Sequence, residues 1–395
     1  MFRAGALLVG LLAGLLIVEF GLRVLGIRPE RYRKPRWLAW DGIAYRDLGI
    51  WGNGLIRRDS EFRAQGVLMG EYVPGARFKE VFDTNPRGYF DEDNGVPMEV
   101  NRRGLRGPMV SPQKPPGVFR ILGLGDSFTF AVGVLEHDTF LRRLEAQLNA
   151  PLPPPAQPRG QASVSTAADN AKPAMYEVLN AGTQGYNIRD EVLYLEHRWL
   201  SLAPDLVLVN FYLNDAYADD TFRNMGEALG IYEEPQGLGR VSYVADLVQH
   251  QLAVRRQRRY TEDYYLKSFF SQADRYVDDP GALSADWKLS RDALAHAVEL
   301  GRQHGFRVAL VIWPELYELE GRYPFEPIHK LVRETCARLG VPVLDLLDTF
   351  RGRKSESLWV HPSDHHPNEE ANRLAADAIE RFLREQHLLT KQSGG

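Results

Sequence analysis

The feature that most constrains the fold of this chain is an alternation of strand-like and helix-like patterns that begins at Gly117. Short apolar runs predict the strands, and apolar residues at helical spacing predict the helices between them. The expected strands are VFRILGL, YEVLNAG, DLVLVNFY, RVALVIWP and VPVLDLL. Strands that alternate with helices form a parallel sheet with helices on both faces. The sequence therefore predicts an α/β domain with a five-stranded parallel sheet over residues 117–390.

Three other segments differ from this pattern in composition. Residues 28–116 are rich in Arg, Gly and Pro and predict a β-rich or irregular, membrane-proximal segment that packs on the main domain. Residues 150–174 are rich in Pro, Ala, Ser and Gln and predict a flexible surface loop. Residues 216–283 form an insertion whose basic run RRQRRY predicts a solvated helix face; contact with an anionic substrate or a lipid headgroup is the lesser alternative.

Charge and cysteine content exclude several classes of function. The formal net charge of the 395 residues is -4 at pH 7, which gives no electrostatic support for nucleic acid as a partner. Cys336 is the single cysteine, so the chain can form neither an intramolecular disulfide nor a cysteine-rich metal site.

The N-terminal residues 1–27 predict an uncleaved transmembrane signal anchor. The run from Ala4 to Val18 carries no charge, and its extension to Ile27 reaches the roughly 20 residues that span a bilayer. Glu19 and Arg23 interrupt this extension, and their i, i+4 spacing allows an ion pair on one helix face. No small-residue cleavage site follows. Because five basic residues follow the segment, charge bias alone would place the main body in the cytoplasm.

Polar residues stand directly after several of the predicted strands. Ser127 follows the first strand, the segment 180–185 follows the second, Asn214 follows the third, and Asp364 and His366 precede the last helix. Ligands of parallel sheets bind beyond the carboxyl ends of the strands. A hydroxyl, a histidine, a carboxylate and hydrogen-bond donors are the groups that acyl transfer needs. Taken singly, the same residues are more typical of turns and helix caps.

The motifs GDSFTF, NAGTQGYN, YLND and DHHPN, in this order, resemble the four sequence blocks of the SGNH/GDSL hydrolase family. The resemblance covers roughly residues 117–387. VNRRGLRG, behind an apolar N-terminal helix, is similar to the membrane-anchored bacterial members. The resemblance implies a flavodoxin-like three-layer αβα sandwich and ester or acyl-group chemistry without a metal or other cofactor.

Position by position, the resemblance implies a role for five residues. Ser127 corresponds to the nucleophile and its backbone N–H to one oxyanion-hole donor. Gly185 corresponds to a second backbone donor and Asn214 to a side-chain amide donor. His366 corresponds to the catalytic base, and Asp364 to the carboxylate that orients it.

Two positions depart from the family pattern. In the family pattern a Gly usually stands two residues before the Asn of the third block. Tyr212 occupies that position here, and its larger side chain narrows the expected pocket. The usual Asp-x-x-His spacing is Asp-x-His here, so the spacing alone does not identify the carboxylate that orients the histidine. His365 as the base would put Pro362 at the acid position, which favours His366 with Asp364. His361 and His365 are expected to be solvated and to take no part in catalysis.

The function expected from these residues is a membrane-anchored serine esterase or deacylase that hydrolyses acyl esters, with O-acetyl esters foremost, through an acyl-enzyme. An O-acetyltransferase acting on a cell-envelope glycan would share the first half-reaction, and sequence does not separate the two. A non-catalytic anchored binding module and a nucleotide-binding protein are the alternatives of other classes. The resemblance places the catalytic domain on the periplasmic side of a bacterial inner membrane.

Overall fold

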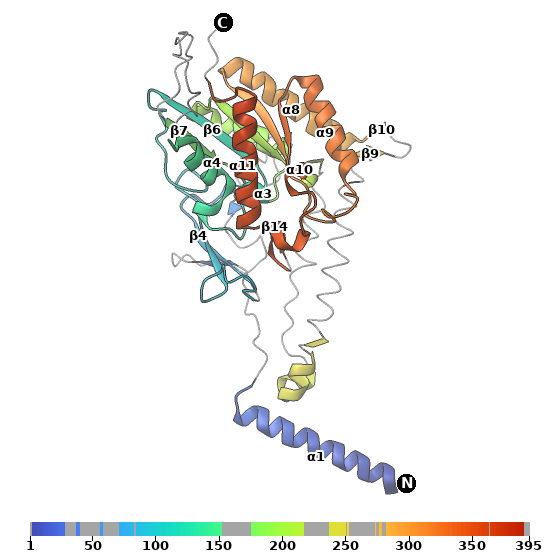
Figure 1. The fold of residues 1–395 in the computed structure, drawn as a ribbon. Helices are drawn as coiled ribbons and strands as arrows, with labels where there is room; N and C mark the ends of the chain where they lie inside the picture. The colour runs from blue at the N-terminus through green and yellow to red at the C-terminus, as the bar shows by residue number, and fades with distance from the viewer. Residues whose placement is uncertain are drawn as a thin grey trace, which may run out of the picture. The chain divides into compact units, whose positions relative to one another are not determined.

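The computed structural model in Figure 1 divides into two compact units, which are described separately. One comprises residues 1–35 and 223–268, and the other comprises residues 36–222 and 269–395. The structure describes residues 2–27, 37–39, 56–57, 71–82, 84–151, 175–216, 237–249, 251–252, 273, 276–278, 282–362 and 364–390. The predicted loop at 150–174 and most of the insertion at 216–283 lie outside the described residues.

The larger unit is built on a five-stranded sheet in which every adjacent pair is parallel. The strands are β6 (Val118–Gly125), β7 (Met175–Asn180), β8 (Leu206–Phe211), β11 (Arg307–Ile312) and β12 (Val343–Asp345). Their order, β12-β11-β8-β6-β7, is the flavodoxin-like order and confirms the predicted sheet. The strand order reverses between β6 and β8. Ligands of such sheets bind at this switch point.

Helices cover both faces of the sheet (Figure 1). The helix α4 (Phe140–Asn149) packs against α11 (Glu369–Glu385), and α5 (Ile188–Tyr194) packs against α8 (Ala285–His304). The connection from β11 to β12 contains α9 (Glu326–Leu339). The apolar residues of α4 explain this packing: Phe140, Leu141, Leu144 and Leu148 recur at helical spacing and are all buried.

Residues N-terminal to β6 form small antiparallel sheets that share the core of the larger unit. One contains β1 (Trp37–Ala39), β4 (Arg77–Val81) and β5 (Gly95–Glu99), and the other contains β2 (Ile56–Arg57) and β3 (Glu71–Tyr72). Apolar residues of β3, β4 and β5 form one buried cluster with residues just after Ser127: Tyr72, Phe78, Met98, Val100, Phe130 and Val132.

The VNRRGLRG segment holds the same region through Arg106. Its buried guanidinium donates to the carbonyl oxygens of Phe130, Ala131 and Val134, and its backbone N–H donates to Asn180 O at 3.0 Å. A buried charge needs such partners, and three carbonyl oxygens supply them. Arg106 therefore holds the backbone at the end of the GDSFTF motif and directly after it.

Short elements complete the larger unit. They are α3 (Ser127–Phe130), β9 (Val277–Asp278), β10 (Ala282–Leu283), α10 (Leu347–Phe350), β13 (Trp359–His361) and β14 (Asp364–Pro367). Of these, β13 and β14 form an antiparallel hairpin directly before α11. The local sequence pattern does not predict this hairpin.

The smaller unit contains α1 (Phe2–Val24), and the predicted pair is present in it, with Arg23 Nε 2.7 Å from Glu19 Oε1. Within the part of the chain that the structure describes, no helix is long and apolar enough to cross a membrane. The predicted transmembrane helix is thus not found.

Candidate active site

Ser127 lies at the start of α3, directly beyond the carboxyl end of β6. The turn between them needs a glycine, because Gly125 has φ +154° and a Cβ added there would lie 1.9 Å from Thr129 Oγ1. Asp126 caps α3, with its Oδ1 accepting from Phe128 N at 2.8 Å. The side chain of Ser127 is half-buried, so the turn presents its hydroxyl at the sheet edge.

His366 and Asp364 lie on β14, at alternate positions of one strand. Side chains at i and i+2 of a strand point to the same side, so a single intervening residue places the carboxylate next to the imidazole. Asp364 Oδ1 lies 2.5 Å from His366 Nδ1 and accepts from His366 N at 3.1 Å. The Asp-x-His spacing is therefore the strand equivalent of the expected Asp-x-x-His.

The other ring nitrogen of His366 reaches the serine, with Nε2 2.9 Å from Ser127 Oγ. Hydroxyl, imidazole and carboxylate form one hydrogen-bonded chain. Burial lowers the pKa of His366, but the surrounding carboxylates, Asp364 foremost and then Glu80 and Asp126, together raise this pKa to about 9. The side chain of His366 is 27% exposed, so an incoming group can reach the imidazole.

The second predicted block is attached to the backbone that carries Ser127. Asn180 Nδ2 donates to Thr129 O at 2.8 Å, and Thr183 N donates to Gly125 O at 2.9 Å. A Cβ added at Gly182 would lie 2.3 Å from Phe130 N, so only glycine allows this approach. Gly185 follows in a turn with φ +74°, a left-handed conformation that favours glycine.

Asn214 lies beyond the end of β8, in the short helical turn Leu213–Ala216. Its Nδ2 donates to Asp126 Oδ2 at 2.9 Å. Burial raises the pKa of Asp126 to about 6. Asp126 thus joins the ends of β6 and β8 at the switch point: one oxygen caps α3 and the other orients the amide. Sequence reasoning gave Asp126 no role, although its position directly before Ser127 is typical of a helix cap.

Tyr212 occupies the position where the family pattern has glycine, and it is buried rather than exposed. Its ring stacks on that of Phe128 with the centroids 3.9 Å apart, and its hydroxyl donates to Glu315, beyond the end of β11. Burial raises the pKa of Glu315 to about 7. Sequence reasoning missed Glu315; the signal available was its place after a strand, in IWPE.

The expectation that His361 and His365 are solvated is wrong. His361 is buried, packs near Phe82 and has its Nε2 2.9 Å from Thr84 Oγ1. The His365 ring stacks on Trp359 at 3.8 Å, and burial lowers its pKa to about 4. His361 lies on β13 and His365 on β14, and only His365 stacks on a ring of the hairpin itself, that of Trp359. Neither ring is the one that meets Ser127.

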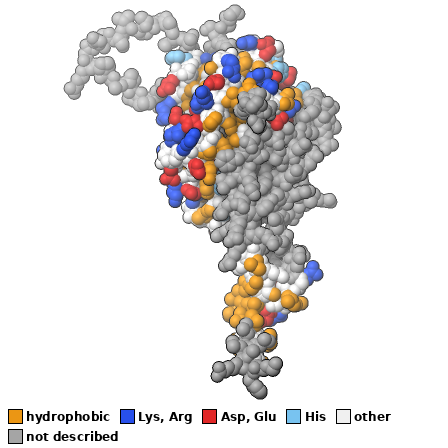
Figure 2. All heavy atoms as spheres, turned by 90° about the vertical axis from the view of Figure 1, so that its right-hand side faces the viewer, with side chains coloured by type: hydrophobic (Ala, Val, Ile, Leu, Met, Phe, Trp, Pro, Cys, Tyr) orange, Lys and Arg blue, Asp and Glu red, His pale blue; other side chains and the backbone are white. Residues whose placement is uncertain are grey.

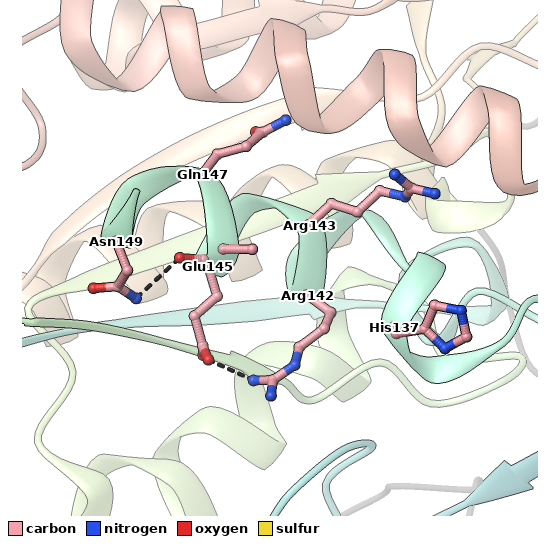
Figure 3. Close-up of a pocket in the computed structure, with 7 residues that line it drawn as sticks. His137, Arg142, Arg143, Glu145, Gln147 and Asn149 are labelled. Carbon is pink, nitrogen blue, oxygen red and sulfur yellow. Dashed lines mark hydrogen bonds and ion pairs between the residues drawn. The ribbon is translucent and has the colours of Figure 1, made fainter. Parts of the chain in front are cut away.

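Figure 3 shows a surface hollow that lies on α4 and not at these residues. Two of its charged groups, Arg142 and Glu145, pair with each other. The backbone oxygen of Glu145 also accepts from Asn149 Nδ2 at 2.9 Å. The hollow therefore presents no unpaired charge from this pair to a ligand. In the described part of the chain, no group of three or more His, Cys, Asp or Glu residues is arranged to hold a metal ion.

Comparison with known proteins gives structural likenesses only. The sequence matches no protein-family profile and no curated protein. Among solved structures, a member of the lipolytic protein G-D-S-L family from Veillonella parvula DSM 2008 is 12% identical, with 68% of this chain and 97% of that chain covered and a TM-score of 0.35. The lipase/acylhydrolase from Enterococcus faecalis is 15% identical, with coverages of 70% and 100% and a TM-score of 0.37. An acetyl xylan esterase from Geobacillus stearothermophilus is 13% identical, with coverages of 67% and 94% and a TM-score of 0.40.

Proposed function

We propose that the chain is a serine esterase that hydrolyses acyl esters through an acyl-enzyme. The observation that carries this proposal is the hydrogen-bonded chain from Ser127 Oγ through His366 to Asp364, with links of 2.9 and 2.5 Å. A serine hydroxyl is a weak nucleophile until an adjacent base takes its proton. His366 is such a base: Asp364 orients its ring, and its Nε2 lies at hydrogen-bond distance from the Ser127 hydroxyl.

The chemistry follows from these contacts. His366 Nε2 takes the proton of Ser127 as the Ser127 oxygen bonds to the ester carbonyl carbon, and the resulting imidazolium is stabilised by Asp364. His366 then gives the proton to the departing alcohol, which leaves the acyl group on Ser127. Water repeats the sequence with His366 as base and releases the acid. The backbone N–H groups of Ser127 and Gly185 and the amide of Asn214 are the proposed donors to the oxyanion.

The acyl group is proposed to be small, with acetyl foremost. The Tyr212 ring, stacked on Phe128 next to the nucleophile, occupies space that glycine would leave open. Rates on p-nitrophenyl acetate, butyrate and octanoate test this point, and the rate is expected to fall with chain length. A preference for octanoate would contradict it.

The decisive experiment compares the wild type with Ser127→Ala on p-nitrophenyl acetate and with a fluorophosphonate probe. We expect Ser127→Ala to lose labelling entirely and turnover by at least about 10⁴-fold. Ser357→Ala removes a serine hydroxyl outside the Ser127–His366–Asp364 hydrogen-bonded chain. This variant is the matched control and should retain both labelling and turnover. Turnover of Ser127→Ala at the wild-type rate would end the proposal.

The cellular location is proposed from the sequence alone. The apolar run from Ala4 to Val18 supports attachment to the inner membrane, with the catalytic unit on the periplasmic side. Carbonate extraction tests attachment, and a C-terminal reporter active only in the periplasm tests the side. Recovery in the carbonate supernatant, or a reporter that is inactive despite normal expression, would contradict the respective point.

A further inference from the structure

The smaller unit joins α1 to a part of the insertion that is more than 200 residues away in sequence. Residues 243–249 and 251–252 are helical and follow the short turn Gly237–Arg240. This part of the insertion, residues 237–252, belongs to the same compact unit as α1. The proposed esterase chemistry gives these residues no role, and lipid contact is only the lesser expectation for the basic run that follows them in sequence.

Glu19 on α1 binds the N-terminus of the insertion helix. Its carboxylate accepts from Ser242 Oγ at 2.8 Å and from the backbone N–H groups of Tyr243 and Val244 at 3.0 Å each. The first N–H groups of a helix have no partner within the helix, and an anion there also meets the positive end of the helix dipole. The Glu19 side chain is 17% exposed, whereas that of its partner Arg23 is 49% exposed.

Arg23 adds further contacts between α1 and the insertion. We call the contacts of Glu19 and Arg23 with residues 241–244 the joint. Its Nε donates to Glu19 at 2.7 Å, its guanidinium lies 5.0 Å from the centroid of the Tyr243 ring, and it donates to Val241 O. Glu19 and Arg23 are the two charged residues between Ala4 and Ile27. The joint pairs both of them, which lowers the cost of placing this segment next to an apolar medium.

Both partners of the joint expose large apolar side chains, as Figure 2 shows for one face of this unit. On the insertion, Leu238 is 74% exposed and Leu252 is 60% exposed. Large exposed apolar side chains include Leu12, Leu15, Leu16, Ile17, Val18, Phe20, Val24 and Leu25 on and after α1, and Val241 and Val248 on the insertion. Apolar surface of this extent marks an interaction site.

The charge pattern of the sequence identifies the partner. Each apolar segment is followed within a few residues by a basic run, RPERYRKPR at 28–36 and RRQRR at 255–259. Apolar surface next to clustered Lys and Arg is typical of elements that lie on anionic bilayers. We propose that residues 237–252, held by Glu19 and Arg23, are a second membrane-contacting element that binds an anionic phospholipid surface together with α1.

The test places a fluorophore on the insertion of the full-length protein. Because Cys336 is fully buried, a Val248→Cys variant can be labelled selectively with a nitrobenzoxadiazole dye. Leu289→Cys, at an exposed apolar position on α8, is the matched control. Each protein is diluted from detergent into buffer, phosphatidylcholine vesicles, or phosphatidylcholine vesicles containing phosphatidylglycerol.

We expect a blue shift and a several-fold intensity gain for the 248 label with phosphatidylglycerol vesicles, a smaller gain with phosphatidylcholine alone, and none for the 289 label. Glu19→Ala in the Val248→Cys background should remove most of the gain while the protein still floats with the vesicles through α1. No gain at 248, equal gains with both vesicle types, or a gain that follows protein concentration without lipid, as for a second copy of the chain, would each overturn the proposal. Esterase activity is not the readout, so failure here leaves the proposed function untouched.

Discussion

At the scale of single residues, His366 is expected to determine how the proposed activity responds to pH. A base acts only when it is unprotonated, and the surrounding carboxylates, Asp364 foremost, raise the pKa of His366 to about 9, against an ordinary value near 6.5. A raised pKa favours the protonated imidazole at neutral pH. Activity should increase as the pH rises toward 9 and level off above it.

The corresponding measurement is kcat/KM for p-nitrophenyl acetate from about pH 6 to about pH 10, with the uncatalysed rate subtracted. In Asp364→Asn the foremost of the charges that raise the pKa is gone, so the inflection should move to lower pH and kcat should fall by about 10³- to 10⁴-fold. An unchanged inflection in Asp364→Asn would show that another group sets the pH profile.

Asp126 and Asn214 are expected to act as a unit. Loss of one oxyanion-hole donor costs about 10²- to 10³-fold in kcat, which is the effect expected for Asn214→Ala. Asp126→Ala should approach the same loss because the amide then lacks its 2.9 Å partner. A double-mutant cycle measures the coupling, and the double variant should be little worse than the worse single variant. Fully additive losses would mean that Asp126 does not position Asn214.

At the scale of elements, the loop that carries Gly182 lies against the backbone of α3 so closely that an added Cβ would not fit. Gly182→Ala forces a Cβ to within 2.3 Å of Phe130 N, and overpacking of this kind costs about 1 to 3 kcal/mol. The urea midpoint of unfolding should be lower for Gly182→Ala than for the wild type. Gly321→Ala, where an added Cβ meets nothing within 4 Å, should leave it unchanged. Equal midpoints for both variants would contradict the packing described.

The elements of the sheet could be predicted from sequence, and the chemistry of the site only in part. In β8 all residues are buried and all but Asn210 are apolar, so local pattern and structure agree. The pairing of β13 with β14 decided the relation of Asp364 to His366, and hairpin pairing in a polar, histidine-rich segment leaves no such pattern. Glu315 meets Tyr212 across 103 positions, a contact that no local pattern specifies.

At the scale of the whole molecule, Cys336 reports on global unfolding. It is fully buried on α9, and burial raises the pKa of its thiol to about 12. Only the thiolate reacts with disulfide reagents, so the native protein should react very slowly. Its labelling by Ellman's reagent in urea should follow the loss of circular dichroism, because exposure requires the sheet and α9 to separate. Fast labelling without urea would reveal local opening around α9.

The strand that carries both Asp364 and His366 has a consequence for how related chains are recognised. The number of residues between an acid and its base depends on the local backbone: one intervening residue suffices on an extended strand, whereas a helical turn brings together residues three or four apart. A text pattern with a fixed Asp-x-x-His gap would therefore reject this chain, although its imidazole meets both partners at hydrogen-bond distance. Searches for such sites will find more of them if they compare the positions of the three functional atoms rather than the count of residues between them.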